Sequence, residues 1–447
     1  MFAVLKNRHY RQLFMAQVVA LLGTGLLTVA LGLLAFDLAG DSAGVVLGTA
    51  LTIKMVAYVG LAPLASALTA RMDRRTVLIC ADLVRGAVAL CLPFIDAVWQ
   101  IYILIFVLQT ASATFTPTFQ AIIPDLLPKE KDYTNALSLS RLAYDIENLV
   151  SPALAGLLLT LISFHWLFVG TVVGFVASAL LVMITAIPAL VAKKDEGSFW
   201  QRVTRGSRIY LATPRLRGLL SLNLAVAATG SMILVNTVVL VRSHFEGSES
   251  DVAVAFAFFG IGSIVAAFTL PKVLDRVRDW PVMMVGGLGS AIVTLSFALL
   301  SIFGGLPSWP VFLATWALLG LLGSVVMTPS GRLLRRSAHS EDRPALFAAQ
   351  FALSHACWLI AYPLAGFLGK WIGLGPTMVV LALLAFVGCL IAVFLWPAQP
   401  QQVLEHSHDD LPPDHPHLED TRVVDGHAVH KHHFVIDDEH RVWPTQG

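Results

Sequence analysis

Long apolar stretches recur along this chain at the length that a lipid bilayer requires. About twelve runs of roughly 20 residues, enough for a helix to cross the hydrocarbon layer, follow one another as far as residue 397. Charged residues make up 13% of the chain and hydrophobic residues 56%, whereas an ordinary soluble domain carries about 25% charged residues. The sequence therefore predicts an all-α polytopic membrane protein with about twelve transmembrane helices, because only helices and closed barrels satisfy the backbone within lipid.

The expected spans form two groups of six, separated by a polar segment. The first group is Gln12–Phe36, Ala43–Leu68, Thr76–Ile95, Val98–Ile123, Ala136–Ser163 and His165–Leu190. The second group is Gly218–Val241, Val252–Pro271, Pro281–Phe303, Pro310–Leu334, Pro344–Gly369 and Gly373–Trp396. We divide the chain accordingly into an N-terminal six-helix bundle (residues 1–190), a cytoplasmic connector (191–217), a C-terminal six-helix bundle (218–397) and a tail (398–447).

The positions of lysine and arginine predict the orientation. An N-terminus in the cytoplasm puts these basic segments on that side: Lys6–Arg11, Arg71–Arg75, Lys193–Arg217, Lys272–Arg278 and Arg332–Arg343. The other side receives Arg242 and Lys370 beside the acidic residues Asp37, Asp41, Asp96, Glu246, Glu249 and Asp251. This asymmetry follows the positive-inside rule, so we expect both termini in the cytoplasm. The basic and aromatic connector fits a helix on an anionic lipid surface better than a nucleic-acid patch.

The two halves repeat each other's features. Thr116-Pro117 in the fourth span returns as Thr328-Pro329 in the tenth, and Pro152 with Gly156 returns as Pro363 with Gly366. The loop after the second span carries Arg71, Asp73, Arg74 and Arg75, and the loop after the eighth carries Asp275, Arg276 and Arg278. The nearly constant offset predicts parallel repeats about an axis along the membrane normal, with substrate bound between the halves near mid-membrane.

This organisation resembles the major facilitator superfamily. The signature of that family after the second span reads roughly G-x-x-x-D-R-x-x-R-R. Here Arg71, Arg74 and Arg75 match, but Ser66 replaces the glycine and Ala70 the aspartate, which leaves Asp73 as a possible substitute. The resemblance implies alternating access of two bundles, a monomer, and a gating role for Arg71, Asp73, Arg74, Arg75, Pro152, Asp275 and Arg276.

Finer resemblances point to an exporter. Residues 151–156 resemble the antiporter motif, loosely G-P-x-x-G-G, with Ser151 in place of the first glycine. The opening LKNRHYRQLF and the ADLVRGAVAL of the third span resemble the drug-exporter branch, which includes macrolide and siderophore exporters. The His-rich tail is similar to that of nickel-resistance exporters. Together these features imply a secondary transporter of the bacterial inner membrane, driven by inward proton movement.

Charge within the spans is concentrated in the first half, at Lys54, Asp82, Arg85, Arg141, Asp145 and Glu147. A charge at the bilayer centre costs from about 3 to more than 10 kcal/mol, so such residues face a cavity or a partner. The Asp82–Arg85 and Arg141–Asp145 spacings suit ion pairs within one helix, which a purely structural network would also use. Glu147 has no basic partner on its own helix and is the first candidate for a proton carrier. Asp145 is the second, and Lys54 could reset either one.

The second half offers few polar residues within its spans. His355 is the main candidate for the substrate cavity, with Asn236, Thr116 and Thr328 as further lining residues. A lone buried histidine is more often a hydrogen-bonded structural residue than a ligand, although imidazole can also bind a metal ion or exchange a proton. The Thr-Pro pairs could free carbonyl groups along the pathway or simply kink the helices.

The tail changes character and is predicted to be mostly disordered. We assign metal capture to its histidines His406, His408, His415, His417, His427, His430, His432 and His433. Imidazole with carboxylates, and no cysteine in the tail, suits Ni²⁺, Co²⁺ or Zn²⁺, while a polar solubilising tail is the alternative. Phe434–Ile436 and Trp443 suggest a short docking element. The four cysteines of the chain lie in apolar runs and predict no disulfide.

These features favour a proton-coupled exporter with protons, the lipid bilayer and a small substrate as its partners, and with no resident cofactor. The preferred substrate is a divalent transition metal, chiefly nickel or cobalt. Two alternatives stay open: efflux of a drug or amphipathic metabolite, and a metal-sensing membrane protein that transports nothing. An enzyme is not expected, because the chain has no nucleotide-binding loop, no His-Glu-x-x-His and no nucleophile–base signature.

Overall fold

The computed structural model of the chain describes residues 2–61, 72–187, 199–274, 276–339 and 342–396, and in the tail 403–407, 422–424, 427–437, 440 and 443. Several side chains within these ranges, including those of Arg141, Asp145 and Pro152, lie outside the described part. The body of the molecule is helical throughout, and the described part of the tail contains three strands.

The described part of the first half contains six α-helices. They are α1 (Arg8–Ala39), α2 (Ala43–Val56), α4 (Arg74–Cys91), α5 (Val98–Leu126), α6 (Glu130–Leu159) and α7 (His165–Met183). Short polar residues start two of them: the side chain of Asn7 accepts hydrogen bonds from the backbone amides of His9 and Tyr10, and Asp73 accepts one from that of Thr76. A π-helical turn, η3 (Ala57–Leu61), continues α2.

The second half repeats the arrangement behind a short amphipathic helix, α8 (Phe199–Ala212). Its elements are α9 (Pro214–Val239) with η5 (Leu240–His244), α10 (Glu249–Leu274), α11 (Asp279–Phe303), α12 (Trp309–Met327), α13 (Ser330–Arg335), α14 (Arg343–Pro363) with η6 (Leu364–Leu368), α15 (Gly369–Trp371) and α16 (Leu374–Leu395). Pro329 separates α12 from α13, because proline cannot continue the backbone ladder. Pro117, by contrast, lies inside the unbroken α5.

The predicted membrane fold is confirmed. Ten stretches of the described residues are long and apolar enough to cross a membrane, and one of these, Arg8–Gly60, contains both α1 and α2. The charged helix α6, which is 30 residues long, is not among the ten. Counting α1 and α2 separately and adding α6 gives the twelve expected spans.

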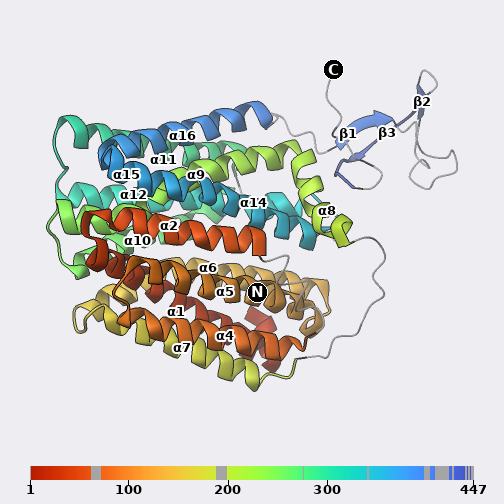
Figure 1. The fold of residues 1–447 in the computed structure, drawn as a ribbon. Coiled ribbons are helices and arrows are strands. Elements are labelled where there is room, and N and C mark those ends of the chain that lie inside the picture. The colour runs from red at the N-terminus through yellow and green to blue at the C-terminus, as the bar shows by residue number, and fades with distance from the viewer. Residues whose placement is uncertain are drawn as a thin grey trace.

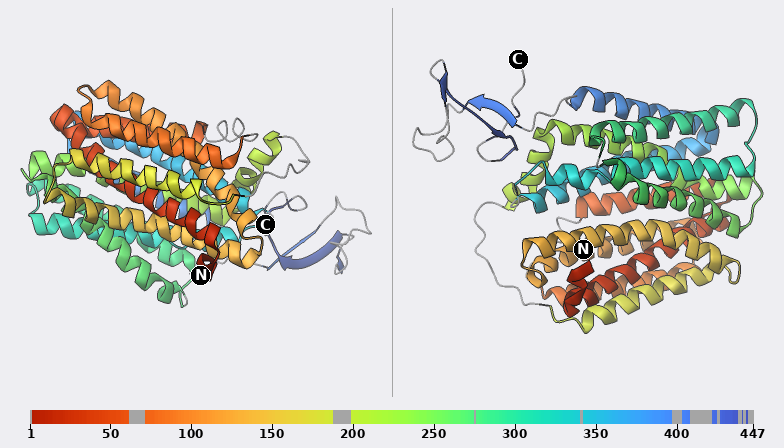
Figure 2. Two further views of the ribbon diagram at one scale, coloured as in Figure 1. Left: turned by 90° about the horizontal axis from the view of Figure 1, so that it is seen from below. Right: turned by 180° about the vertical axis from the view of Figure 1, so that it is seen from behind.

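The helices form two bundles that meet along a seam (Figure 1). One bundle contains α1, α4, α5, α6 and α7, and the other contains α9, α11, α12, α14 and α16. At the seam, α2 packs against α14, η6 and α9, while α6 packs against α10. The N-terminus, α8 and the tail lie toward one end of the molecule (Figure 2), which we call the basic end; the loops with Asp41, Asp96 and Glu246 mark the acidic end.

The apolar core differs between these two ends. At the acidic end one continuous cluster joins both halves and includes Leu34, Leu47, Phe168, Phe312 and Leu381. At the basic end the core is divided into one cluster within the first half and another within the second. Among the described residues, the two halves therefore share one core at the acidic end, and each has its own core at the basic end.

Close helix contact at the acidic end depends on glycine. A Cβ on Gly366 would lie 2.7 Å from the carbonyl oxygen of Gly44, and one on Gly48 would lie 3.0 Å from that of Tyr362. These glycines let the backbones of α2 and η6 approach each other, as small residues do in membrane helix pairs. The Ser243 hydroxyl also donates to the Asp41 carboxylate across the seam, at 2.5 Å.

The described part of the tail contains strands, whereas the sequence predicts a mostly disordered tail. Strands β1 (Val403–Ser407), β2 (Arg422–Val424) and β3 (His427–His433) form an antiparallel sheet in the order β1-β3-β2. After β3, the side chains of Phe434 and Ile436 are buried in the second-half cluster of the basic end. The strands contain valine and leucine, and burial of the apolar residues that follow stabilises order that the charge content alone does not predict.

Candidate functional site

The charged residues Lys54 on α2 and Glu147 on α6 form the centre of a polar cluster. Each lies about a dozen residues, or roughly 18 Å, from the acidic-end terminus of its helix, which is deep within a bilayer. Both are partly exposed and interact electrostatically with each other. Glu147 makes no direct ion pair or hydrogen bond with any residue that the structure describes. An accessible carboxylate without a fixed partner can take up a proton or a cation.

Tyr58 extends the cluster to the second half. Its ring lies 5.6 Å from the Lys54 ammonium, measured to the ring centroid. The same ring lies 5.8 Å from that of Phe351 and 5.4 Å from that of His355, both on α14. Tyr58 belongs to the π-turn η3, a helix irregularity that is frequent at functional sites. Aromatic groups from both halves thus meet beside the Lys54–Glu147 pair.

His355 is fixed on its own helix. Its Nδ1 lies 2.6 Å from the carbonyl oxygen of Phe351, which requires a donated proton and therefore leaves Nε2 unprotonated in the neutral ring. The ring also stacks on that of Phe351, with centroids 4.0 Å apart. The His355 ring also interacts electrostatically with the charge of Lys54. The predicted cavity residue of the second half is therefore brought to the charged pair of the first half.

Hydroxyl groups complete the first-half side of the cluster. Tyr144 on α6 interacts with Thr116 and with Gln17, and Tyr58 interacts with Ser112. Gln17 in turn accepts a hydrogen bond of 3.0 Å from Ser140. Thr116, which the sequence places among the lining residues, joins the cluster through Tyr144. The sequence does not identify Tyr58 and Tyr144 as site residues, because a single tyrosine in an apolar run forms no recognisable pattern.

Asp82 and Arg85 form a separate, buried ion pair within α4. Asp82 has no exposed surface and Arg85 is 6% exposed. The Arg85 guanidinium lies 4.3 Å from the ring centroid of Phe115 and 4.6 Å from that of Phe175. A pair enclosed by aromatic rings inside one bundle supports the structural interpretation of this predicted pair.

Two predicted cavity residues lie away from the cluster. Asn236 is buried at the acidic-end seam, where its amide donates to the carbonyl of Ala365 at 2.9 Å and its side chain lies against Gly44. Thr328 is exposed in the turn between α12 and α13, at the basic end. Asn236 therefore stabilises the closed seam, and Thr328 marks the break caused by Pro329.

The predicted gating residues have local partners. Asp73 caps α4, and the hydrogen bond from the backbone amide of Thr76 lowers the pKa of its carboxyl. Arg75 donates to the carbonyl of Thr185 at 2.7 Å, which fastens the start of α4 to the end of α7. Arg276 is exposed. Arg71 and Asp275 lie outside the described residues, as do the side chains of Pro152, Arg141 and Asp145.

The second half contains a basic-end ion-pair cluster that sequence reasoning missed. Asp279, at the start of α11, pairs with Arg332 and, at 3.4 Å, with Arg336. Arg332 also donates to the carbonyl of Leu274 at 3.2 Å. Arg332 and Arg336 are four residues apart and therefore lie on one helix face. This spacing is the sequence feature that could have predicted a shared acidic partner.

The tail histidines can be placed only by the register of the sheet. His406 is paired with His430, and Leu404 with His432. Alternation along the strands therefore puts His406, His430 and His432 at positions on one face. Their side chains, and those of His408, His415, His417, His427 and His433, lie outside the described residues. Within the described part of the chain, no group of three histidine, cysteine or acidic residues is arranged to hold a metal ion.

The end of the tail docks on the basic end of the second half. Phe434 stacks edge-on against Trp443, with centroids 5.1 Å apart, and the Arg215 guanidinium lies 5.7 Å from the ring centroid of Trp443. Asp437 accepts from the amide of His440 at 2.7 Å and lies 3.3 Å from His339. The predicted docking element is therefore present in the structure.

The connector helix α8 contributes to the same surface. Arg205 pairs with Asp342 at 2.5 Å, which fastens α8 to the start of α14. Tyr210 donates a hydrogen bond of 2.5 Å to Gln350, and burial raises the pKa of its hydroxyl. The expected surface helix is therefore packed against protein on at least one face.

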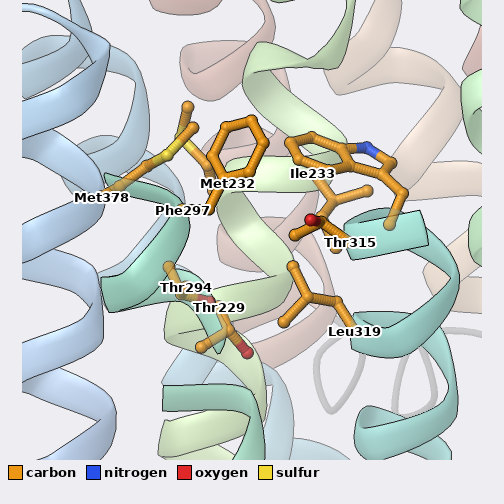
Figure 3. A pocket seen from close by; sticks show the side chains of 9 residues that line it. Thr229, Met232, Ile233, Thr294, Phe297, Thr315, Leu319 and Met378 are labelled. Atoms are coloured by element: carbon orange, nitrogen blue, oxygen red, sulfur yellow. The ribbon is translucent and has the colours of Figure 1, made fainter. Parts of the chain in front are cut away.

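The enclosed space in the second half does not coincide with the polar cluster. A cavity of about 10 Å³ lies between α9, α11, α12 and α16, and its lining includes Thr229, Met232, Thr294, Phe297 and Met378 (Figure 3). This volume suits about one water molecule, so the cavity is too small for a substrate. A second cavity of about 330 Å³, with His244 and Ser301 in its lining, lies at the acidic end.

Comparisons with known proteins agree with this architecture. A family model described as Major Facilitator Superfamily matches residues 13–303 and 220–429. The chain belongs to the major facilitator superfamily. Solved structures of this fold include a bacterial homologue of the human lysosomal transporter Spinster (TM-score 0.65, 13% identity, covering 88% of this chain and 98% of that one). The nucleoside transporter NupG has a TM-score of 0.65 at 13% identity and covers 87% of this chain and 100% of that one.

Relatives of known sequence lie within the same superfamily. The uncharacterised MFS-type transporter YfiS of Bacillus subtilis (strain 168) is 22% identical over 349 residues, which cover 74% of this chain and 82% of that protein. Macrolide efflux protein A of Streptococcus pyogenes is 24% identical over 236 residues, covering 50% of this chain and 58% of that protein. The enterobactin exporter EntS of Escherichia coli O1:K1 is 24% identical over 327 residues, covering 71% and 74% respectively.

Proposed function

We propose that this superfamily member is a proton-coupled exporter in which Glu147 carries the proton. The observation that carries the proposal is a partly exposed carboxylate, deep within the helices, that has no direct partner among the described residues. An ionisable group at that depth is expensive and usually functional. Its electrostatic interaction with Lys54 provides a counter-charge when Glu147 is ionised.

The arrangement of the core supports an inward-facing state. The basic end is the cytoplasmic end by the positive-inside rule, with both termini on that side of the bacterial inner membrane. The halves share one apolar cluster at the opposite end and have separate clusters at the cytoplasmic end. Rocking of the two bundles about the central cluster would reverse this arrangement and expose Glu147 to the outside.

The outward direction is supported by the relatives. Those named for a substrate are a macrolide efflux protein, an enterobactin exporter and a staphyloferrin A transporter. Their names favour a small organic molecule as the substrate of this chain. The described surroundings of Glu147 agree, because they consist of aromatic rings, hydroxyl groups and the amine of Lys54.

A divalent metal ion, chiefly Ni²⁺ or Co²⁺, is the second candidate substrate. The observation that favours it is the sheet register of the tail, which puts His406, His430 and His432 at positions on one face. Such a tail would collect ions at the cytoplasmic end and deliver them to the cavity. A doubly charged ion would still need negative charges along the pathway to offset its own charge. Glu147 is the carboxylate of the central cluster among the described residues. The organic substrate is therefore the better-supported candidate.

Transport in everted membrane vesicles tests both candidates. The substrates are a labelled macrolide, a catecholate siderophore and radioactive Ni²⁺, each with and without an acid-inside gradient. We expect gradient-driven accumulation of an organic substrate by the wild type, reduced at least tenfold in Glu147→Gln and unchanged in the exposed control Glu246→Gln. Gradient-dependent transport that survives in Glu147→Gln would contradict the proton role. Accumulation of Ni²⁺ alone would instead favour the metal.

A further inference from the structure

We propose that the central cluster binds an organic cation and that Lys54 occupies the place of this cation while the site is empty. The inference rests on the proposed function and names its substrate class. It is carried by the juxtaposition of Lys54, Glu147 and the ring of Tyr58 at the seam between the halves. An alkylammonium or quaternary group would take the position now held by the lysine side chain.

The first argument is the position of the ammonium group. The Lys54 Nζ lies 5.6 Å from the ring centroid of Tyr58, within the distance at which an aromatic face attracts a cation. The amine has no direct ion pair with any described residue and remains partly exposed. A cation held by a ring face and by a carboxylate at longer range can be displaced by a competitor of the same charge.

The second argument is the aromatic wall around this position. Tyr58 comes from the first half, whereas Phe351 and His355 come from α14 of the second, and their rings lie 5.8 and 5.4 Å from that of Tyr58. Planar or bulky organic cations bind between such faces. A ligand that contacts both halves at once would also link its own binding to the movement of one half relative to the other.

The third argument is the balance of charge around Glu147. Among the residues that the structure describes, the ionisable groups that interact with its carboxylate are Lys54, Tyr58 and Tyr144. His355 of α14 interacts with Lys54, and Arg85 of α4 interacts with Tyr58 while paired to Asp82. Lys54 is thus the cation that balances Glu147 among the described residues, and a substrate of single positive charge would leave that balance unchanged.

The fourth argument is the direction of coupling. Export driven by inward protons requires that the proton and the substrate exclude each other from the site. A cation meets this requirement, because protonation of Glu147 removes the charge that binds it. An anion would behave in the opposite way: protonation of Glu147 would free Lys54 to bind it, so that anion and proton would travel in the same direction. The Lys54–Glu147 pair supports antiport only with a cation.

Equilibrium binding of tritiated tetraphenylphosphonium to the purified full chain tests the proposal. We expect about tenfold tighter binding in Lys54→Met, which removes the competing ammonium, and wild-type binding in the control Lys54→Arg. Tyr58→Leu should weaken binding about tenfold. At a pH low enough to protonate Glu147, cation binding to the wild type should release this proton, and Glu147→Gln should abolish the release. Size-exclusion profiles and thermal melts confirm that each variant is folded.

Two results would overturn the proposal. One is unchanged or weaker cation binding in folded Lys54→Met. The other is a wild type that binds none of tetraphenylphosphonium, ethidium and benzalkonium but does bind an anionic dye, more tightly at low pH and through Lys54. Proton-driven export in vesicles that depends on Glu147, observed beside either result, would leave the proposed function intact. Gradient-dependent export that does not depend on Glu147 would instead refute the proton role of Glu147.

Discussion

Single charged residues have different roles according to their surroundings. Glu147 is partly exposed and has no direct partner among the described residues, whereas Asp82 is enclosed with Arg85 between aromatic rings. Both carboxylates lie in membrane helices of the first half, and the sequence already distinguishes them, because only Asp82 has a basic residue at ion-pair spacing on its own helix face. The two side chains differ in exposure. Glu147 is partly exposed, so a proton can reach its carboxylate, whereas Asp82 is buried and ion-paired with Arg85.

The buried pair predicts a stability effect without a transport effect. Asp82→Asn would leave the Arg85 guanidinium charged and without its carboxylate, which costs about 3–5 kcal/mol in buried pairs. We expect a lower free energy of unfolding in mixed detergent, measured by tryptophan fluorescence, and unchanged proton-coupled transport per folded molecule. The exposed control Asp96→Asn should change neither quantity. Loss of transport in well-folded Asp82→Asn would assign the pair to the proton pathway.

At the scale of elements, the docked end of the tail is attached to the half that carries α14. Phe434 and Ile436 are 2% and 1% exposed in the basic-end cluster of the second half, which also contains Ile209 and Tyr210 of α8 and Leu346 of α14. The His-rich sheet is therefore connected to a helix that contributes His355 to the central cluster. Events at the tail could in this way influence the position of α14.

This docking predicts a protease-sensitive variant. Ile436→Asp would bury a charge among apolar side chains, so the tail should detach from the helical body. We expect trypsin to cleave the tail after Arg422, Lys431 and Arg441 at least tenfold faster than in the wild type, as followed by gel electrophoresis and mass spectrometry. The control Gln402→Asp adds the same charge upstream of the sheet and should leave the rate unchanged. Equal rates for wild type and Ile436→Asp would show that the docked segment adds no protection.

At the scale of the whole molecule, the proposed function requires the seam to alternate between two packed arrangements. The shared core at the acidic end and the divided core at the basic end describe one of them. Alternating access requires that the other be only a few kcal/mol away, so small changes in the contact surface should shift the populations measurably.

The glycine contact between α2 and η6 offers such a change. In Gly366→Ala the new Cβ would meet the carbonyl oxygen of Gly44 at 2.7 Å, so the acidic end must loosen. We expect a larger outward-open population, seen as a longer distance between spin labels on the acidic-end loops of the two halves. Gly331→Ala is the matched control, because its Cβ would have no neighbour within 4 Å. An unchanged distance distribution in Gly366→Ala would mean that this contact does not hold the seam.

The sequence by itself determined the fold and much of the topology. Runs of membrane length can satisfy their backbone only as helices, and the repeated Thr-Pro and basic-loop features indicated two similar halves. Glu147 was also accessible to sequence reasoning, because a carboxylate without a helical partner is conspicuous in an apolar run. Periodicity and charge are local properties, and these conclusions needed nothing else.

Only the tertiary structure decided which residues meet. Tyr58 and Tyr144 carry no local signal, yet packing brings both to Glu147, and it also pairs Asp279 with the distant Arg332. Asn236 and Thr328 have the polarity of lining residues but lie at the closed seam and in a helix break. Order in the tail likewise depends on a surface built by α8 and α14. Contacts between distant segments depend on the angles and positions at which helices cross. The identity of a single residue does not determine that geometry.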